Sequence, residues 1–144
     1  MQIEVETTAL TQQHNKQTLI TRALSLTEAL IPTLDPYGIM GPLNHDDTID
    51  TLIDMANNGV LIVHEQGLIG GTIGTSPINR SRTFAFERVF YAKAGFRSLI
   101  GEFEAWAVSQ GAGGVVLSCF APKVGRIYEK MGYSRLETYY CKGV

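Results

Sequence analysis

Glu87 and Tyr128 are two side chains in this sequence whose chemistry suits proton transfer. Glu87 is the one acidic residue in the aromatic-rich stretch 83–91. Partial burial among aromatic rings raises the pKa of a carboxyl group toward neutrality, where its carboxylate can act as a general base. Tyr128 carries a phenol, which can donate a hydrogen bond without being ionised at pH 7. A carboxyl group and a phenol can carry out acid–base chemistry together only where a fold brings them to one site.

Each of these two side chains also has a purely structural interpretation. Glu87 can be a solvent-facing strand residue that pairs with Arg88 or another cation. Tyr128 can be a packing residue on the inward face of a helix, with its hydroxyl satisfied as in many buried tyrosines. The residue types alone leave both alternatives open.

The N-terminal third is predicted to form a strand, a helix and a loop. Polar and apolar residues alternate over Gln2–Glu6, which indicates a short first strand. Apolar residues recur at helical spacing from Leu19 to Leu30, and Pro32 is expected to end that helix. The stretch from Asp35 to Pro42 contains too many glycines and prolines to be regular, so we expect a loop there.

A second helix and a hairpin are predicted next. Asp46 or Asp47 can cap the start of the helix, and Asn58-Gly59 is expected to close it in left-handed geometry. Two β-rich stretches, 60–64 and 68–75, flank a Gln-Gly turn signal. This arrangement predicts a β-hairpin.

Strands and helices are predicted to alternate in the C-terminal half. The expected order is strand 83–91, helix 96–110, strand 114–119, helix 122–131 and strand 135–142. Pro122 suits the first turn of a helix, where its missing N–H costs nothing, and Gly132 can cap the end of the same helix. The strand 114–119 is mostly apolar, which favours a central strand buried on both faces. Cys119 and Cys141 fall in predicted strands and are expected to be small core residues.

This element order predicts an α/β fold of the mixed α+β type. Residues 1–144 are expected to form a single domain, with a central mixed sheet covered by helices on both faces. Because a helix joins the strands of the C-terminal half, parallel pairing is expected there.

Composition excludes several classes of function. The formal net charge is -2 and the pI is near 5.9, with no cluster of Lys and Arg, so nucleic acid is not an expected partner. No apolar run approaches the roughly 20 residues that span a bilayer, and the N-terminus lacks a signal-peptide pattern. A cytoplasmic protein without a membrane partner is therefore expected. The three histidines have no ligand spacing, so no metal site is predicted.

Several short motifs in the sequence resemble motifs of the GNAT superfamily of N-acetyltransferases. The motif Tyr128-Glu129-Lys130-Met131-Gly132-Tyr133 is similar to the end of the last helix in that family. Small GNAT-like proteins encoded by phages have sequences that resemble two further stretches, residues 68–71 and residues 103–107 with Gly111-Ala112. The resemblance covers about Gly59 to Lys142, and the N-terminal third agrees in element order only.

The segment 92–97 departs from the phosphate-binding pattern of this family. GNAT proteins usually carry Gln or Arg, two residues, Gly, one residue, then Gly or Ala before the long helix. Here Ala92 replaces the polar residue and Arg97 replaces the second small one, while Gly95 fills the first glycine position. Backbone N–H groups at a helix start still suit a pyrophosphate, and Lys93 can add a charge-assisted bond.

The resemblance implies an acyl-CoA N-acyltransferase fold and acetyl-CoA as co-substrate. It makes Glu87 the base that deprotonates an amine and Tyr128 the acid that protonates the departing thiolate. The residues expected at the cofactor are Phe90, Tyr91, Lys93, Ala94, Gly95, Phe96 and Arg97.

Two functions are weighed from this resemblance. The first is acetyl-CoA-dependent N-acetylation of a primary amine on a protein or small molecule. The alternative is a catalytically silent GNAT-like binding protein, such as a phage accessory protein, a virion component or an inhibitor of a host factor. In the phage case the expected location is the host cytoplasm. A homodimer is slightly favoured, because the stretch 135–142 could pair across a two-fold axis.

Overall fold

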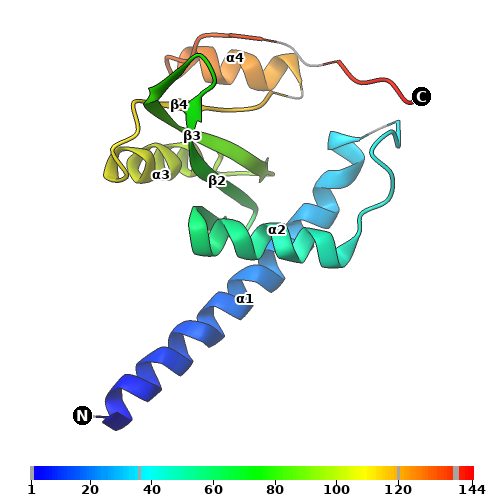
Figure 1. Cartoon of the computed structure of the whole chain (residues 1–144). Coiled ribbons are helices and arrows are strands. Elements are labelled where there is room, and N and C mark those ends of the chain that lie inside the picture. The colour runs from blue at the N-terminus through cyan, green and yellow to red at the C-terminus, as the bar shows by residue number, and fades with distance from the viewer. Residues whose placement is uncertain (1, 36, 120, 138–139) are drawn as a thin grey trace.

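The computed structural model describes residues 2–35, 37–119, 121–137 and 140–144 (Figure 1). Within these residues the elements follow in the order α1 (Gln2–Leu34), α2 (His45–Asn58), β1 (Val60–His64), β2 (Gly67–Ser76), β3 (Asn79–Ala92), α3 (Phe96–Ser109), β4 (Gly114–Val116) and α4 (Pro122–Lys130).

The four strands form one mixed sheet in the order β1-β2-β3-β4. The pairs β1–β2 and β2–β3 are antiparallel, which confirms the predicted hairpin. β3 and β4 are parallel, as the intervening helix α3 led us to expect. The prediction of a central strand at 114–119 was wrong, because β4 is three residues long and lies at the end of the sheet.

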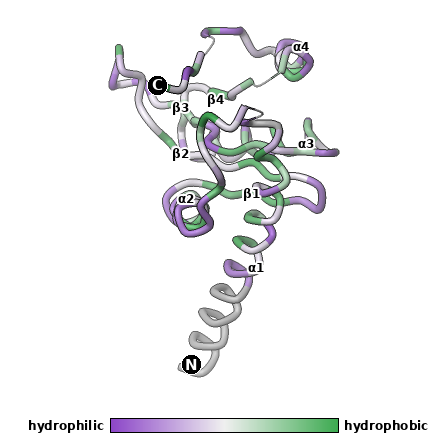
Figure 2. Tube along the Cα trace, turned by 90° about the vertical axis from the view of Figure 1, so that its right-hand side faces the viewer, coloured by the Kyte–Doolittle hydropathy of each residue, from purple (hydrophilic) through white to green (hydrophobic). Residues whose placement is uncertain are grey.

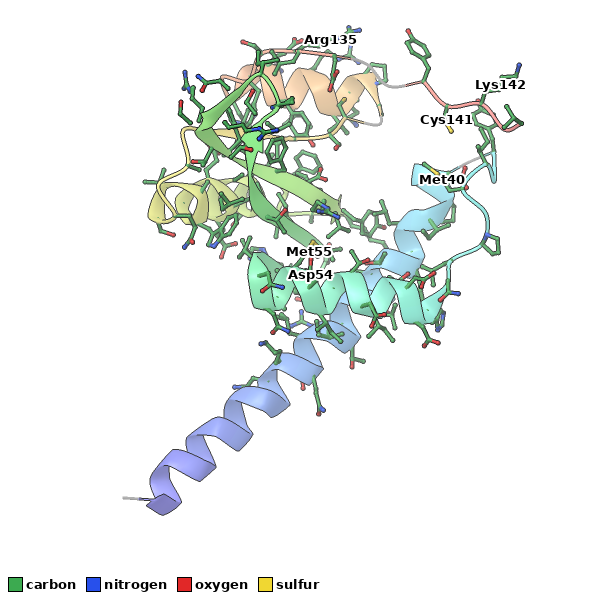
Figure 3. The ribbon with its side chains drawn as sticks, viewed as in Figure 1. Met40, Asp54, Met55, Arg135, Cys141 and Lys142 are labelled. Carbon is green, nitrogen blue, oxygen red and sulfur yellow. The ribbon has the colours of Figure 1, made fainter. Side chains whose placement is uncertain are left out.

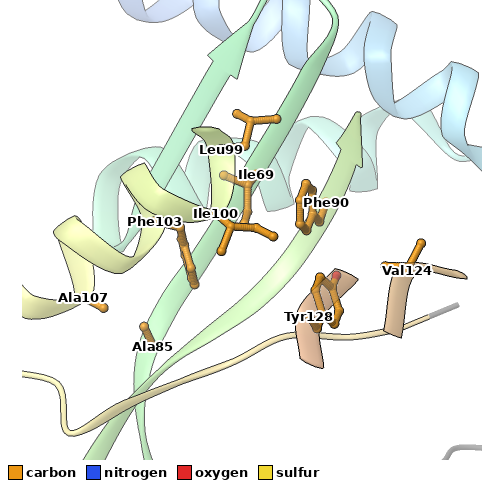
Figure 4. Close-up of a cluster of buried hydrophobic side chains, with 9 residues drawn as sticks. All are labelled: Ile69, Ala85, Phe90, Leu99, Ile100, Phe103, Ala107, Val124 and Tyr128. Carbon is orange, nitrogen blue, oxygen red and sulfur yellow. The ribbon is translucent and has the colours of Figure 1, made fainter. Parts of the chain in front are cut away.

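Helices cover both faces of this sheet, as predicted. α1 and α2 pack on one face, over a cluster of Ala23, Leu52, Met55, Leu61 and Leu68. α3 and α4 supply the other cluster, which contains Ile69, Ala85, Phe90, Leu99, Ile100, Phe103, Ala107, Val124 and Tyr128 (Figure 4). Neighbouring strand residues such as Leu68 and Ile69 enter opposite clusters, because successive side chains on a strand point to opposite faces. Figure 3 places Met55 between α2 and the sheet, and Figure 2 shows hydrophobic residues along the strands.

The predicted first strand at Gln2–Glu6 was wrong, because α1 is one helix from Gln2 to Leu34. An alternation over five residues is a short signal, and no Gly or Pro interrupts the chain before Pro32. Pro32 itself lies in the last turn of α1, so the helix ends two residues later than predicted.

Both ends of α2 differ in detail from the prediction. Asn44, rather than Asp46 or Asp47, caps the helix, and its side-chain oxygen accepts a hydrogen bond of 3.0 Å from the Asp47 N–H. The left-handed closure predicted at Gly59 was wrong, since its φ is -146°. A Cβ at Gly59 would lie 2.1 Å from the Gly71 carbonyl oxygen, so glycine is required there by close approach.

The C-terminal stretch shows no strand in its described part. Residues 135–137 and 140–142 are not in a strand, and Thr138 and Tyr139 lie outside the described residues. A strand persists only where its backbone finds a partner, and the sheet ends at β4. The expectation of core cysteines was also wrong: Cys119 and Cys141 are exposed free thiols.

Candidate active site

Glu87 lies on β3 beside a β-bulge. In the pairing of β2 with β3, Gly70 faces Val89 and Gly71 faces Glu87, so Arg88 is an extra residue on β3. Ala85 and Phe90 are an odd number of residues apart, yet both enter the α3–α4 cluster. The bulge explains this, because it shifts the alternation of side chains by one position. Glu87, two residues after Ala85, therefore shares the α3–α4 face with Phe90.

The strands β3 and β4 separate at Glu87. Their parallel pairing covers only Phe84–Phe86 and Gly114–Val116. Beyond that point β3 keeps β2 on one side and has no strand on the other within the described residues. Backbone groups of β3 between Glu87 and Ala92 therefore border a gap in strand pairing within the described residues, which is called the opening below. A bound molecule could accept hydrogen bonds from them there.

Glu87 and Tyr128 meet on the backbone of Ser118, at the start of this opening. The Ser118 N–H donates to Glu87 Oε1 over 3.4 Å. The Tyr128 hydroxyl donates to the Ser118 carbonyl oxygen over 2.8 Å. The two candidate proton-transfer groups thus come together from β3 and α4.

Burial raises the pKa of both groups. It raises the pKa of Glu87 from 4.5 to about 7, and the Ser118 N–H bond opposes this shift. Burial also raises the pKa of the Tyr128 hydroxyl well above its usual range, with further contributions from the charges of Glu87, Cys119 and Tyr133. Near neutral pH, Glu87 can therefore exchange a proton while Tyr128 keeps its own.

Aromatic rings join α4 to the rest of the site. The Phe90 and Phe96 rings stack with centroids 4.5 Å apart, and the Phe96 and Tyr128 rings stack at 6.0 Å. No Cα atom of α4 comes within 8 Å of another helix or strand in the described part of the chain. α4 is therefore attached to the body through side chains, among which Val124 and Tyr128 are buried.

The turn between β3 and α3 leads into the N-terminus of α3, whose first backbone N–H groups have no side-chain cap. Gly95 occupies the N-cap position with a φ of 75°, and no side chain caps the helix. The first-turn N–H groups of α3 are thus open to an anion, and the helix dipole favours negative charge there. Lys93 and Arg97 are exposed at the same turn. These residues fit a pyrophosphate despite the departure at Ala92 and Arg97.

The structure groups most of the predicted site residues but not all of them. Glu87, Phe90, Phe96 and Tyr128 share the α3–α4 face, and Lys93, Ala94, Gly95 and Arg97 lie at the start of α3. The Tyr91 side chain packs against the opposite cluster, so only its backbone can border the opening. Ser118 was missed, because it contributes through its backbone and no side-chain pattern marks it.

Other features of the described residues lie apart from this site. A hollow of about 410 Å³ between α1, α2 and β1 contains none of the predicted site residues in its lining. Among the residues described, no group of three or more His, Cys, Asp or Glu side chains could hold a metal ion. No helix in the same residues is long and apolar enough to cross a bilayer.

Comparison with solved structures defines the class of fold. An acetyltransferase from Trypanosoma brucei shares 18% identity and a TM-score of 0.58, over 84% of this chain and 92% of its own. Glucosamine-6-phosphate N-acetyltransferase from Arabidopsis thaliana shares 15% identity and a TM-score of 0.54, over 83% and 92% of the two chains. The chain therefore has the GNAT-type acetyltransferase fold.

A third similar structure was solved with a ligand. AAC(6')-Iy, in complex with a bisubstrate analog named CoA-S-monomethyl-acetylneamine, shares 15% identity and a TM-score of 0.58, over 84% of this chain and 92% of its own. No protein-family model and no curated protein sequence matches the chain.

Proposed function

We propose that the protein is an acetyl-CoA-dependent N-acetyltransferase that acts on a primary amine. The observation that carries this proposal is the meeting of Glu87 and Tyr128 on Ser118, at the point where β3 and β4 separate. The likeness in fold to acetyltransferases, one of them solved with a CoA-containing ligand, supports acetyl-CoA as the co-substrate.

Glu87 is proposed as the general base. A lysine-like amine has a pKa near 10.4 and is protonated at neutral pH, so it must lose a proton to become a nucleophile. With a pKa of about 7, Glu87 is ionised in roughly half of the molecules at neutral pH. It can then take the amine's proton directly or through a water molecule.

Tyr128 is proposed as the general acid. Acetyl-CoA would supply a thioester carbonyl and a thiolate leaving group. The raised pKa of Tyr128 keeps its hydroxyl protonated, so it can donate a hydrogen bond to that leaving group, although the same shift makes the phenol a weaker acid and sets a limit on full proton transfer. A backbone N–H of β3 near Phe90 can stabilise negative charge that develops on the carbonyl oxygen.

The start of α3 is proposed to hold the pyrophosphate of the co-substrate. Its uncapped N–H groups, with Lys93 and Arg97 beside them, suit an anion that carries more than one charge. The acceptor amine, a protein partner, a homodimer and a cytoplasmic or phage-related setting stay predictions from the sequence.

The proposal is tested by binding and by turnover. A ligand that binds only the folded state stabilises it by about 2.7 kcal/mol at a hundredfold excess over its dissociation constant, so acetyl-CoA should raise the melting temperature with dose. Thiol release from acetyl-CoA is then measured over a panel of primary amines. Glu87→Gln and Tyr128→Phe should each lower kcat by roughly 100-fold or more.

Two exposed residues provide matched controls. Glu65→Gln and Tyr140→Phe make the same chemical changes away from the site and should leave kcat within about twofold. Equal losses in control and site variants would refute the assignment of Glu87 and Tyr128.

A second candidate function is a catalytically silent protein of the same fold. The departure at Ala92 and Arg97 favours it, because these positions replace a polar residue and a small residue of the family pattern. Absence of any thermal shift with millimolar acetyl-CoA and free CoA would select this candidate over the enzyme.

A further inference from the structure

Tyr128 occupies a position in α4 that is mobile in most short helices. α4 has nine residues, and Tyr128 lies in its last turn. Isolated helices of this length are marginal in water, and helix ends fray. Because α4 has no close backbone contact with other elements of the described chain, something local must hold this turn.

A Schellman cap closes the turn that contains Tyr128. Gly132 has a φ of 93°, in the left-handed region, and its N–H donates to the Glu129 carbonyl over 3.1 Å. The next residue, Tyr133, donates its N–H to the Tyr128 carbonyl over 3.0 Å. These are the two hydrogen bonds that define the motif, which satisfies carbonyls at a helix end.

The side chain of Tyr133 completes this cap with a ring contact. Its ring lies against the Tyr128 ring, with centroids 5.8 Å apart and planes tilted by 47°. The Phe96 ring stacks on Tyr128 at 6.0 Å. Tyr128 therefore contacts one ring from the start of α3 and one from just beyond its own helix, while its hydroxyl is bonded to Ser118.

The hydroxyl of Tyr133 takes no part in these contacts. It is buried and has no hydrogen-bond partner among the described residues. Burial, followed by the charge of Glu104, raises the pKa of Tyr133 to about 12, so this hydroxyl stays protonated at neutral pH. The contact with Tyr128 thus depends on the ring of Tyr133 and its backbone N–H.

We propose that Tyr133 is a positioning residue, whose ring holds Tyr128 in the orientation that places its hydroxyl at Ser118. This inference rests on the proposed function, in which Tyr128 is the acid. Tyr133 touches no reacting atom, and its effect on turnover passes through Tyr128.

The kinetic test is a double-mutant cycle in the full chain. Tyr133→Ala should lower kcat roughly tenfold, with the KM for acetyl-CoA within about twofold, because small misplacements of a catalytic group are costly. Tyr133→Phe keeps the ring and should retain wild-type kcat. In a Tyr128→Phe background, Tyr133→Ala should change kcat by less than about twofold, since the acid is already gone.

Two results would overturn the inference. One is an equal loss of kcat from Tyr133→Ala with and without Tyr128, which would indicate a general structural role. The other is an unchanged kcat in Tyr133→Ala. If the alanine variant does not fold, Tyr133→Leu takes its place in the same cycle and is judged by the same criteria. Tyr140→Ala, at a site 93% exposed, is the control for loss of a tyrosine ring.

A spectroscopic measurement separates failure of this inference from failure of the proposed function. The protein is labelled with 3-fluorotyrosine, and the Tyr128 signal is identified by its loss in Tyr128→Phe. Tyr133→Ala should move that fluorine signal toward the value of free fluorotyrosine, and Tyr133→Leu should do so less. A shifted signal in a protein without acetyl transfer would support the positioning role and refute the function. An unshifted signal in an active enzyme would refute the positioning role alone.

Discussion

The two faces of the sheet are built from different side chains. The cluster under α1 and α2 is mainly aliphatic, with Leu52, Met55, Leu61 and Leu68 at its centre. The cluster under α3 and α4 is richer in aromatic rings and includes Phe90, Phe103 and Tyr128. Every described group with a clearly shifted pKa, namely Glu87, Tyr128 and Tyr133, belongs to the α3–α4 side. The α1–α2 face therefore contributes packing alone, whereas the α3–α4 face combines packing with the groups suited to acid–base chemistry.

The largest loss of stability is expected from Gly71→Ala, which adds a methyl group on the α3–α4 face. Its Cβ would lie 2.2 Å from the Phe86 carbonyl oxygen and 2.8 Å from the Phe103 ring. The backbone oxygen cannot rotate away, so the free energy of unfolding should fall by about 3 kcal/mol or more. Gly101→Ala on α3 meets open space and should be neutral or slightly stabilising. Urea unfolding of both variants measures the difference, and equal stabilities would contradict the geometry at the bulge.

Leu68→Ala removes a buried side chain from the aliphatic cluster under α1 and α2. Leu68 is fully buried, so the variant should lose about 2–5 kcal/mol of unfolding free energy. Because Leu68 lies on the face away from Glu87 and Tyr128, kcat per folded molecule should stay within about twofold of wild type. Unfolding curves and active-site-normalised rates give the two numbers. A large fall in kcat without unfolding would show that the two faces are not independent.

On the α3–α4 face, burial of Glu87 should make the stability of the protein depend on pH. The folded state binds the Glu87 proton more tightly than the unfolded state, because its pKa is raised from 4.5 to about 7. The contribution of Glu87 to stability therefore falls as pH rises from 4.5 to 7, and stays low above that range. The shift corresponds to a penalty on the order of 3 kcal/mol at pH 8.

Glu87→Gln provides the comparison that isolates this penalty. The variant should be more stable than wild type at pH 8, and the difference should disappear near pH 4. A Glu65→Gln control should show no such change. Stability curves that run parallel for Glu87→Gln and wild type across this range would contradict the burial of the carboxyl group.

The smallest expected loss of stability comes from the N-cap of α2, on the α1–α2 face. Asn44→Ala removes the side-chain acceptor for the Asp47 N–H and should cost about 1 kcal/mol. Thermal unfolding measures the loss, and acetyl transfer per folded molecule should not change. Asn44→Asp keeps an acceptor at the same position and should retain most of the stability.

Elements with a strong local pattern were predictable from the sequence. The hairpin, α3 and α4 follow from apolar periodicity, a turn signal and the capping residues Pro122 and Gly132. Glu87 and Tyr128 were also proposed from the sequence. A carboxyl among aromatic residues is visible in the residue order, whereas Tyr128 was chosen through the resemblance of its motif to the GNAT superfamily.

Features that depend on distant backbone were not predictable in the same way. The requirement for glycine at position 59 comes from the carbonyl of Gly71, and Ser118 acts through its own peptide groups. The predicted strands at 2–6 and 135–142 rested on short alternations, which carry no information about whether a partner strand is available. The extra residue at Arg88 is likewise set by pairing with β2 and has no signature of its own.

The bulge at Arg88 adds one residue to β3 without changing which residues of β2 and β3 face each other on either side of it. Deleting this single residue would leave Glu87 opposite Gly71 and Val89 opposite Gly70, now in regular alternation. Phe90 would stay on the α3–α4 face with Ile69, and Tyr91 would stay on the opposite face with Leu68. What the extra residue supplies is the local bend and twist of β3, because a bulge increases both. The strand therefore changes direction immediately after Glu87, at the point where its pairing with β4 has ended.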